Sequence, residues 1–117
     1  MKRRTFLRSL NDAFQGVYFA ARMERNMRFH LIAAALVLAA SLYFKIEKIE
    51  LLFVLTAIFI VIITELLNTA LEKTVDLYTQ EYHPLAEIVK HVAAGAVLCA
   101  AIFALIVAYL VFGDKIL

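Results

Sequence analysis

The most restrictive feature of this sequence is a run of 22 residues without a charged side chain, residues 92–113. In an α-helix, at about 1.5 Å per residue, such a run is long enough to cross the ~30 Å hydrocarbon layer of a bilayer. Residues 31–44 and 51–64 form two further charge-free runs of 14 residues each, and the second continues past Glu65 in mostly apolar sequence to Leu71. The sequence therefore predicts three membrane spans. The alternative for the two shorter runs is a re-entrant or soluble helical hairpin.

The composition agrees with a membrane protein of one domain. Of the 117 residues, 64% are hydrophobic and only 22 are charged, 12 Lys and Arg against 10 Asp and Glu. This apolar excess is too large for the core of one small soluble domain, and it also excludes a disordered chain. Cys99 is the only cysteine, which excludes a disulfide within the chain. The net charge of +2 is too small for a protein that binds nucleic acid.

The basic residues are concentrated near the N-terminus. Residues 1–29 hold seven of the twelve, namely Lys2, Arg3, Arg4, Arg8, Arg22, Arg25 and Arg28. Two more, Lys73 and Lys90, flank the predicted loop between the second and third spans. The remaining three fall on the opposite side: Lys45, Lys48 and Lys115. Because basic residues favour the cytoplasmic side of a membrane, we expect the N-terminus and the second loop to be cytoplasmic and the C-terminus to lie outside.

The basic N-terminal segment also has the pattern of an amphipathic helix. Its apolar residues recur at steps of three and four: Phe6, Leu10, Phe14, Val17, Tyr18 and Ala21. We expect residues 1–26 to form a surface helix in the membrane interface, with a partner-binding helix as the alternative. The predicted spans are residues 27–45, 50–72 and 90–113. The only proline, Pro84, predicts the start of the helix that carries the third span.

Polar residues interrupt the second span on one side. At about 100° per residue, five of them fall within a stripe about 100° wide: Glu65, Asn68, Thr69, Glu72 and Asp76. A solvated helix end would explain the last two acids, but it does not explain Glu65 and Asn68, which lie further into the apolar run. The seven-residue step from Glu72 places Glu65 about 10 Å deeper. An ionisable residue at that depth is costly, which makes Glu65 a candidate functional residue.

Three carboxylates and an amide on one helix face suit a hard divalent cation such as Mg²⁺, which prefers oxygen ligands and phosphates. Glu24 lies at the same predicted level, although an exposed pairing with Arg25 or Arg28 also explains it. Lys90, where the third span enters the membrane, is suited to phosphate binding or to anchoring at the interface. This combination indicates phosphoryl transfer to or from a lipid headgroup. The chain's three glycines cannot form a phosphate-binding loop, so side chains and metal would have to hold a nucleotide.

These residues lie in a longer motif. It reads ELLNTALEKTVD over residues 65–76 and EYHPLA over 81–86, followed by Lys90 and AAGAV over 93–97. The motif, and essentially the whole chain, resembles the small prokaryotic diacylglycerol kinase and undecaprenol kinase family, and the EYHPLA wording is similar to the Gram-positive undecaprenol kinase branch. The resemblance implies an all-α integral membrane protein of the bacterial cell (inner) membrane. It further implies a multi-pass homotrimer with cytoplasmic N-termini and sites shared between neighbouring protomers.

The resemblance also implies an activity for residues 1–117 as one membrane kinase domain. The expected reaction is ATP- and Mg²⁺-dependent phosphorylation of undecaprenol at the cytoplasmic face, with diacylglycerol as the alternative lipid alcohol. By resemblance, Glu65 is the general base, Glu24 and Glu72 hold Mg²⁺, and Asn68 lines the site. The implied nucleotide-binding positions are Glu72, Asp76, Glu81, Tyr82, His83, Lys90 and His91. Taken alone, His83 is equally explained as a loop histidine beside Pro84.

One position departs from the family pattern, which has aspartate directly after the lysine, whereas this chain has His91 after Lys90. The imidazole would either weaken a hydrogen-bond network or contact phosphate itself. A low-activity variant and a non-catalytic relative are therefore alternatives, and the sequence leaves open whether His91 is natural or introduced. A function of another class is a small proton-coupled transporter that uses Glu65. Such proteins usually have four spans with the carboxylate in the first, which disfavours that reading.

Overall fold

The computed structural model describes residues 5–117, which form four α-helices and no strand. They are α1 (Phe6–Met23), α2 (Arg25–Tyr43), α3 (Lys48–Tyr78) and α4 (Pro84–Ile116). Each of α2, α3 and α4 is long and apolar enough to cross a membrane. The expected all-helical fold, with three spanning helices preceded by an N-terminal helix, is confirmed. The first four residues of the expected surface helix, with Lys2, Arg3 and Arg4, lie outside the described residues.

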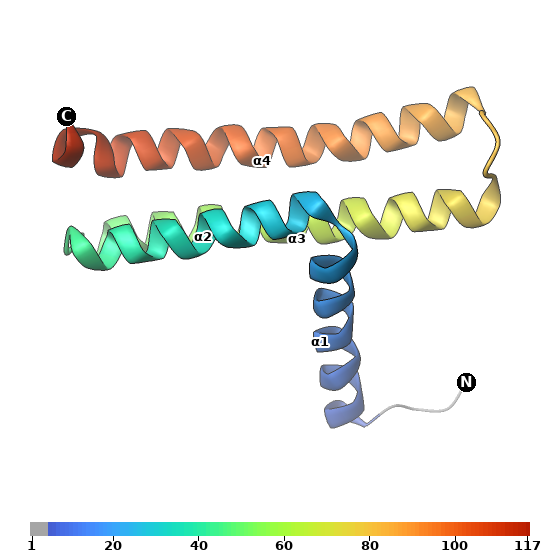
Figure 1. Ribbon diagram of the computed structural model, residues 1–117, viewed down its shortest axis with the longest axis horizontal. Helices are drawn as coiled ribbons and strands as arrows, with labels where there is room; N and C mark the ends of the chain where they lie inside the picture. The colour runs from blue at the N-terminus through green and yellow to red at the C-terminus, as the bar shows by residue number, and fades with distance from the viewer. Residues whose placement is uncertain (1–4) are drawn as a thin grey trace.

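Helix α1 stands apart from the other three. Figure 1 shows α2, α3 and α4 lying side by side, while α1 leaves the start of α2 at a steep angle. The hydroxyl of Thr5 caps α1 by accepting the backbone N–H of Arg8 at 3.2 Å. Of the residues in α1, only Ala20 is buried, so the apolar side chains of this helix are not covered by the rest of the chain.

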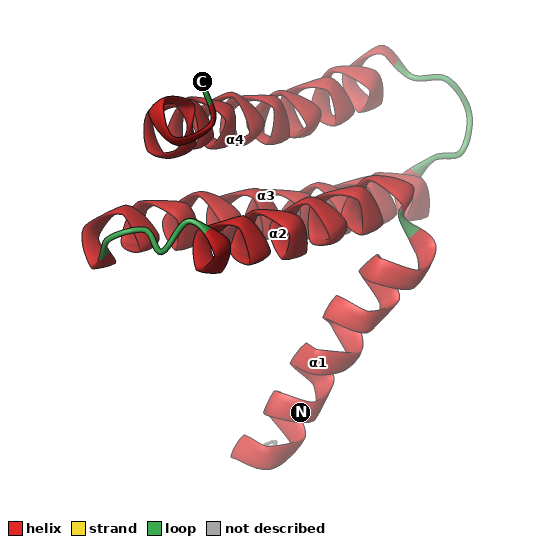
Figure 2. Cartoon of the chain, turned by 60° about the vertical axis from the view of Figure 1, so that its left-hand side comes forward, coloured by secondary structure: helices red, strands yellow, loops and turns green. Residues whose placement is uncertain are grey.

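The bend between α1 and α2 lies at Glu24, whose backbone is extended. The Arg28 guanidinium donates a 2.6 Å hydrogen bond to the carbonyl oxygen of Arg22, in the last turn of α1. A cation at this position satisfies a free carbonyl and complements the helix dipole. The bend directs α1 away from the bundle in both views (Figures 1 and 2).

The turn between α2 and α3 is closed by two backbone hydrogen bonds. The N–H of Lys45 donates to the carbonyl of Leu42, and the N–H of Ile46 donates to that of Ser41, both at 3.3 Å. This is the Schellman pattern, whose central residue has a left-handed backbone and is usually glycine. Here that residue is Lys45, with φ of 51°. The tight turn returns the chain antiparallel to α2.

Helices α3 and α4 form an antiparallel pair. The reciprocal hydrogen bonds of a capping box between Glu47 and Glu50 begin α3. The predicted helix start at Pro84 is confirmed, with proline in the first turn of α4. An ion pair lies near each end of the pair: Lys90 Nζ is 2.8 Å from Asp76 Oδ1, and Lys115 Nζ is 3.2 Å from Glu50 Oε2.

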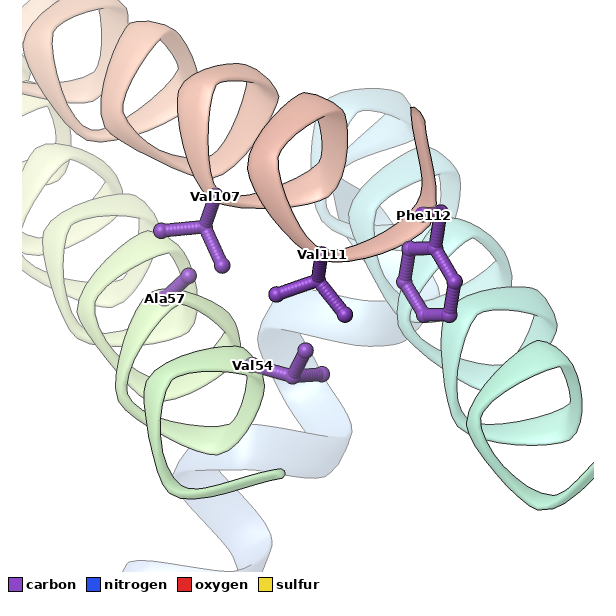
Figure 3. Packing of buried hydrophobic residues seen from close by; sticks show 5 residues of the cluster. All are labelled: Val54, Ala57, Val107, Val111 and Phe112. Carbon is purple, nitrogen blue, oxygen red and sulfur yellow. The ribbon is translucent and has the colours of Figure 1, made fainter. Parts of the chain in front are cut away.

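The buried apolar cluster lies at the end of the bundle opposite the α3–α4 turn. Figure 3 shows its five side chains reaching from α3 and α4 into the space between them and α2: Val54, Ala57, Val107, Val111 and Phe112. The small residues Ala104 and Ala108 pack against the cluster and allow the helices to approach closely. The α1–α2 bend and the α3–α4 turn lie toward the other end (Figure 1).

Candidate active site

Glu65 occupies a core position of α3. The buried residues of this helix recur at steps of three and four: Val54, Ala57, Val61, Glu65 and Thr69. The side chain of Glu65 is only 2% exposed, although the surrounding helix is predominantly apolar. A carboxylate at a position that packing would give to an aliphatic residue must be stabilised by a partner or serve a function.

The nearest partner of Glu65 comes from α2. His30 Nε2 lies 3.3 Å from Glu65 Oε1, but the contact does not have the alignment of a formed hydrogen bond. Oε1 therefore remains buried without a hydrogen bond among residues 5–117. His30 was not among the site residues predicted from the sequence. The sequence signal for His30 is its three-residue spacing from the apolar Met27, which puts both residues on one face of α2. The structure shows that Met27 is fully buried on this face.

Two further carboxylates lie close enough to Glu65 to repel its charge: Glu72, on the same helix, and Glu24, at the α1–α2 bend. Glu72 Oε1 accepts a 3.3 Å hydrogen bond from Asn68 Nδ2, while Asn68 Oδ1 is buried and unpartnered within residues 5–117. Glu24 Oε1 lies 4.0 Å from Lys73 Nζ of α3. Both residues expected to hold metal thus act electrostatically on the expected base, and one of them, Glu72, is hydrogen-bonded to Asn68.

Arginine pairing, the other explanation for Glu24, is not what the structure records. The guanidinium of Arg28 instead binds carbonyl oxygens at the end of α1, and the cation recorded near the Glu24 carboxylate is Lys73. The recorded neighbour of the Glu24 carboxylate is thus on α3. The position of Glu24 at the bend between two helices makes this proximity possible.

The fit of this group to a divalent cation follows from its donor atoms. Within residues 5–117, no set of three or more His, Cys, Asp or Glu side chains is arranged to hold a metal ion. The donors are nevertheless all oxygens: the carboxylates of Glu24 and Glu72, which both act on Glu65, and the unpartnered amide oxygen of Asn68. Such a set fits a cation that takes one or two carboxylates and completes its coordination with phosphate and water. It does not fit a closed structural metal site.

A separate polar pocket of about 340 Å³ lies at the α3–α4 turn. Its lining includes six of the seven residues expected at the nucleotide: Asp76, Glu81, Tyr82, His83, Lys90 and His91. The seventh, Glu72, is outside this lining, but its charge acts on Lys90 as well as on Glu65. The charge of Glu72 therefore influences both Lys90 in the pocket and the buried carboxylate of Glu65. The volume is at the low end for ligand sites, so the pocket would leave much of a nucleotide uncovered.

The two histidines of this pocket differ in position. His83 Nδ1 accepts the backbone N–H of Leu85 at 3.1 Å and so caps α4, which agrees with its interpretation as a loop histidine beside Pro84. The side chain of His91 is 73% exposed, and its Nε2 lies 3.8 Å from Glu87 Oε1 one turn earlier. His91 is thus an exposed residue of the pocket lining.

Taken together, the site has two parts at different depths. The shallow part, at the α3–α4 turn, presents a lysine and polar groups able to contact an anionic ligand. The deep part places a buried carboxylate beside a histidine, below the acidic group of Glu24 and Glu72. This order suits a reaction between a polar phosphate donor and an alcohol held in the lipid phase.

Several known proteins are similar to this chain in sequence. The pattern of the family described as prokaryotic diacylglycerol kinase matches residues 11–112. The undecaprenol kinase of Bacillus subtilis (strain 168) is 40% identical over 111 residues, covering 95% of this chain and 90% of that protein. A diacylglycerol kinase of Synechocystis is 45% identical over 100 residues, but the match covers 57% of that longer protein. The diacylglycerol kinase of Escherichia coli (strain K12) is 28% identical over 100 residues. The match spans the positions of all the site residues described above, from 24 to 91, and this chain therefore belongs to the prokaryotic diacylglycerol kinase family of membrane lipid kinases.

Proposed function

We propose that this chain is an ATP- and Mg²⁺-dependent kinase that phosphorylates undecaprenol at the cytoplasmic face of the bacterial inner membrane. The observation that carries this proposal is the buried Glu65 carboxylate in an apolar helix, with Glu72 and Asp76 further along the same helix toward the polar pocket. The order of these acids along α3 matches a donor that arrives from water and an acceptor that stays in lipid.

The proposed chemistry assigns one proton transfer to Glu65. As the lipid hydroxyl oxygen bonds to the γ-phosphorus of ATP, the bond from that phosphorus to the bridging oxygen of ADP breaks, and its electron pair leaves with ADP. The hydroxyl proton passes to Glu65. A base must reach the hydroxyl in the substrate complex, and a carboxylate buried at the depth of a lipid headgroup is placed for this role.

The remaining residues bind and orient the nucleotide. We assign Glu24 and Glu72 to Mg²⁺, which when bound offsets the negative charge of the phosphates. Lys90 contacts phosphate oxygens, and Asn68 holds Glu72 in place through the hydrogen bond described above. Asp76, Glu81, Tyr82, His83 and His91 line the nucleotide pocket.

We further propose a homotrimer with α1 in the membrane interface and the N-terminus in the cytoplasm. The shallow, open pocket supports a site completed by a neighbouring protomer. The uncovered apolar side chains of α1 and its steep angle to the bundle support the interfacial placement (Figure 2). The α1–α2 bend and the α3–α4 turn lie toward the same end of the bundle, as the basic-residue distribution requires.

The choice of undecaprenol over diacylglycerol rests on the relatives. The Bacillus protein named undecaprenol kinase matches this chain over 90% of its own length, whereas the Synechocystis diacylglycerol kinase matches over 57%. The EYHPLA segment over residues 81–86, at the start of α4, points to the same branch. The test is to present both lipids at equal concentration in mixed micelles with radiolabelled ATP and to compare the rates of phosphate transfer. Faster transfer to diacylglycerol would reverse the assignment.

The role of Glu65 is tested by Glu65→Gln, which keeps the size of the side chain and removes its basicity. We expect lipid phosphorylation to fall by at least ~10²-fold while ATP binding is retained, because the proton acceptor is lost but the nucleotide pocket is not. Glu47→Gln, at the far end of α3, makes the same chemical change outside the site and should leave turnover unchanged. A Glu65→Gln variant with full activity would refute the base assignment.

A further inference from the structure

His30 is a polar residue that the proposed chemistry has not used, although its ring is directed at the proposed base. It lies on the face of α2 that packs against α3, one turn after the fully buried Met27, and its side chain is 17% exposed. Its Nε2 is 3.3 Å from Glu65 Oε1. The edge of the neighbouring Phe29 ring contacts the imidazole, with the ring centroids 5.5 Å apart.

The carboxylate needs such a neighbour for two reasons. Its Oε1 atom is buried without a formed hydrogen bond, and the acids acting on it, Glu72 and Glu24, repel its charge. Lys73 lies beside Glu24, and Lys90 is hydrogen-bonded to Asp76, so both cations are engaged elsewhere. His30 is the group whose nitrogen lies within hydrogen-bonding distance of Glu65 in the described residues 5–117.

We propose that His30 is a positioning residue that donates its Nε2–H to Glu65 Oε1 and so orients the carboxylate for proton abstraction. This inference rests on the proposed role of Glu65 as the base. The two atoms lie within hydrogen-bonding distance, and the proposal requires the ring to align its N–H with Oε1 in the reacting complex. Catalytic hydrogen bonds are commonly misaligned before substrate binds and tighten in the reacting complex.

This role is consistent with the proton balance of the reaction. With His30 donating to Oε1, the other carboxylate oxygen accepts the hydroxyl proton as the oxygen–phosphorus bond forms. Oε1 then belongs to a neutral carboxyl group and still accepts the same hydrogen bond. The imidazole therefore transfers no proton in this step, and the proton taken up by Glu65 leaves the carboxyl group before the next turnover.

The experiment compares His30→Phe with His30→Gln in the full-length protein. Phenylalanine keeps the ring but has no donor, whereas glutamine loses the ring and keeps an N–H donor. For His30→Phe we expect kcat to fall by about tenfold to a hundredfold, the loss of one hydrogen bond to a charged group, with the KM for ATP unchanged within about twofold. For His30→Gln we expect kcat to recover to within about tenfold of the parent. Ile32→Ala, an exposed position two residues further along α2, is the control that should keep the parent rate.

A packing role for His30 predicts the reverse order, with the phenylalanine variant active and the glutamine variant impaired, and that result would overturn the proposal. The Glu65→Gln variant separates this inference from the proposed function. If Glu65→Gln is inactive and His30→Phe has parent kcat, the base assignment stands and the positioning role is wrong. If Glu65→Gln is active, the base assignment itself fails. In the Glu65→Gln background, adding His30→Phe should cause no further loss, because the two residues act on one step.

Discussion

Lys90 Nζ donates a 2.8 Å hydrogen bond to Asp76 Oδ1, which joins the first turns of α4 to the last turns of α3. The two side chains are 40% and 45% exposed, so water and ions can reach the pair. An exposed ion pair of this kind is weak and exchanges readily for a better partner. The lysine can therefore leave Asp76 for a phosphate oxygen when a nucleotide enters the pocket, because phosphate forms the stronger charge-assisted hydrogen bonds.

The first prediction follows from this exchange. Replacing Lys90 by Gln removes the cation that contacts phosphate, so we expect the KM for ATP to rise by about tenfold or more. The thermal midpoint should change little, because the pair lies at the surface. Steady-state lipid phosphorylation over a range of ATP concentrations measures the first effect. An unchanged KM for ATP would show that Lys90 stays with Asp76 during turnover.

The second prediction concerns the metal. Chelation by EDTA should abolish phosphate transfer, and added Mg²⁺ should restore it. Because Glu24 is one of two proposed carboxylate ligands, Glu24→Gln should raise the Mg²⁺ concentration needed for half-maximal activity by about tenfold or more, the effect of losing one charged ligand. Asp114→Asn, at the opposite end of the bundle, is the control. Equal Mg²⁺ requirements in the two variants would remove Glu24 from the metal site.

Much of the helical layout could be predicted because long charge-free runs and helix caps are local signals. The charge-free run over 31–44, the apolar sequence around Glu65 and the run over 92–113 led to three long helices, and the structure has them. The bend at Glu24 was less accessible. It depends on Arg28 binding the end of the preceding helix, and a hydrogen bond between two helix termini leaves no periodic pattern in sequence.

The candidate site was predicted in part for the same reason. The angular spacing on one helix placed Glu65 with Asn68, Glu72 and Asp76, since residues three, four and seven apart share a face. His30 was missed because it comes from α2, and the depth at which α2 meets α3 follows from packing between helices. The roles assigned to these residues remain predictions that the experiments above address.

The third prediction addresses the residue that departs from the family pattern. His91 is exposed and lies near Glu87 of its own helix. Its imidazole has no oxygen, so it adds no acceptor oxygen to the pocket. Replacing His91 by Asp supplies such an oxygen beside Lys90, and we expect turnover to rise by about tenfold, the value of one charge-assisted hydrogen bond. Glu87→Gln removes the same neighbour without adding an acid and should not reproduce the gain. Parent activity in His91→Asp would show that the histidine does not limit the rate.

The fourth prediction concerns the α2–α3 turn. Lys45 has φ of 51°, a backbone conformation that costs about 1–2 kcal/mol for a residue with a Cβ. Glycine adopts it without this cost, so Lys45→Gly should stabilise the protein by about 0.5–1 kcal/mol after the added entropy of the unfolded chain. Thermal unfolding in detergent measures the change. Lys48→Gly, in the first turn of α3, is the matched comparison and should destabilise, because its backbone is helical.

The final prediction separates packing inside the bundle from contact with lipid. Phe112 is 7% exposed and belongs to the buried cluster, and its ring lies 6.1 Å, centroid to centroid, from that of Phe44 at the C-terminal cap of α2 (Figure 3). In a membrane, moving an apolar side chain between protein and lipid gains little, and the stability of the bundle depends on close packing. Phe112→Ala should therefore lower the free energy of unfolding by about 1–3 kcal/mol through the cavity it leaves.

The control for this prediction is Leu110, whose side chain is 69% exposed. Lipid chains can fill the space left by Leu110→Ala, so that variant should unfold at the parent temperature. Equal losses in the two variants would mean that a second copy of the chain covers Leu110 as closely as α2 and α3 cover Phe112.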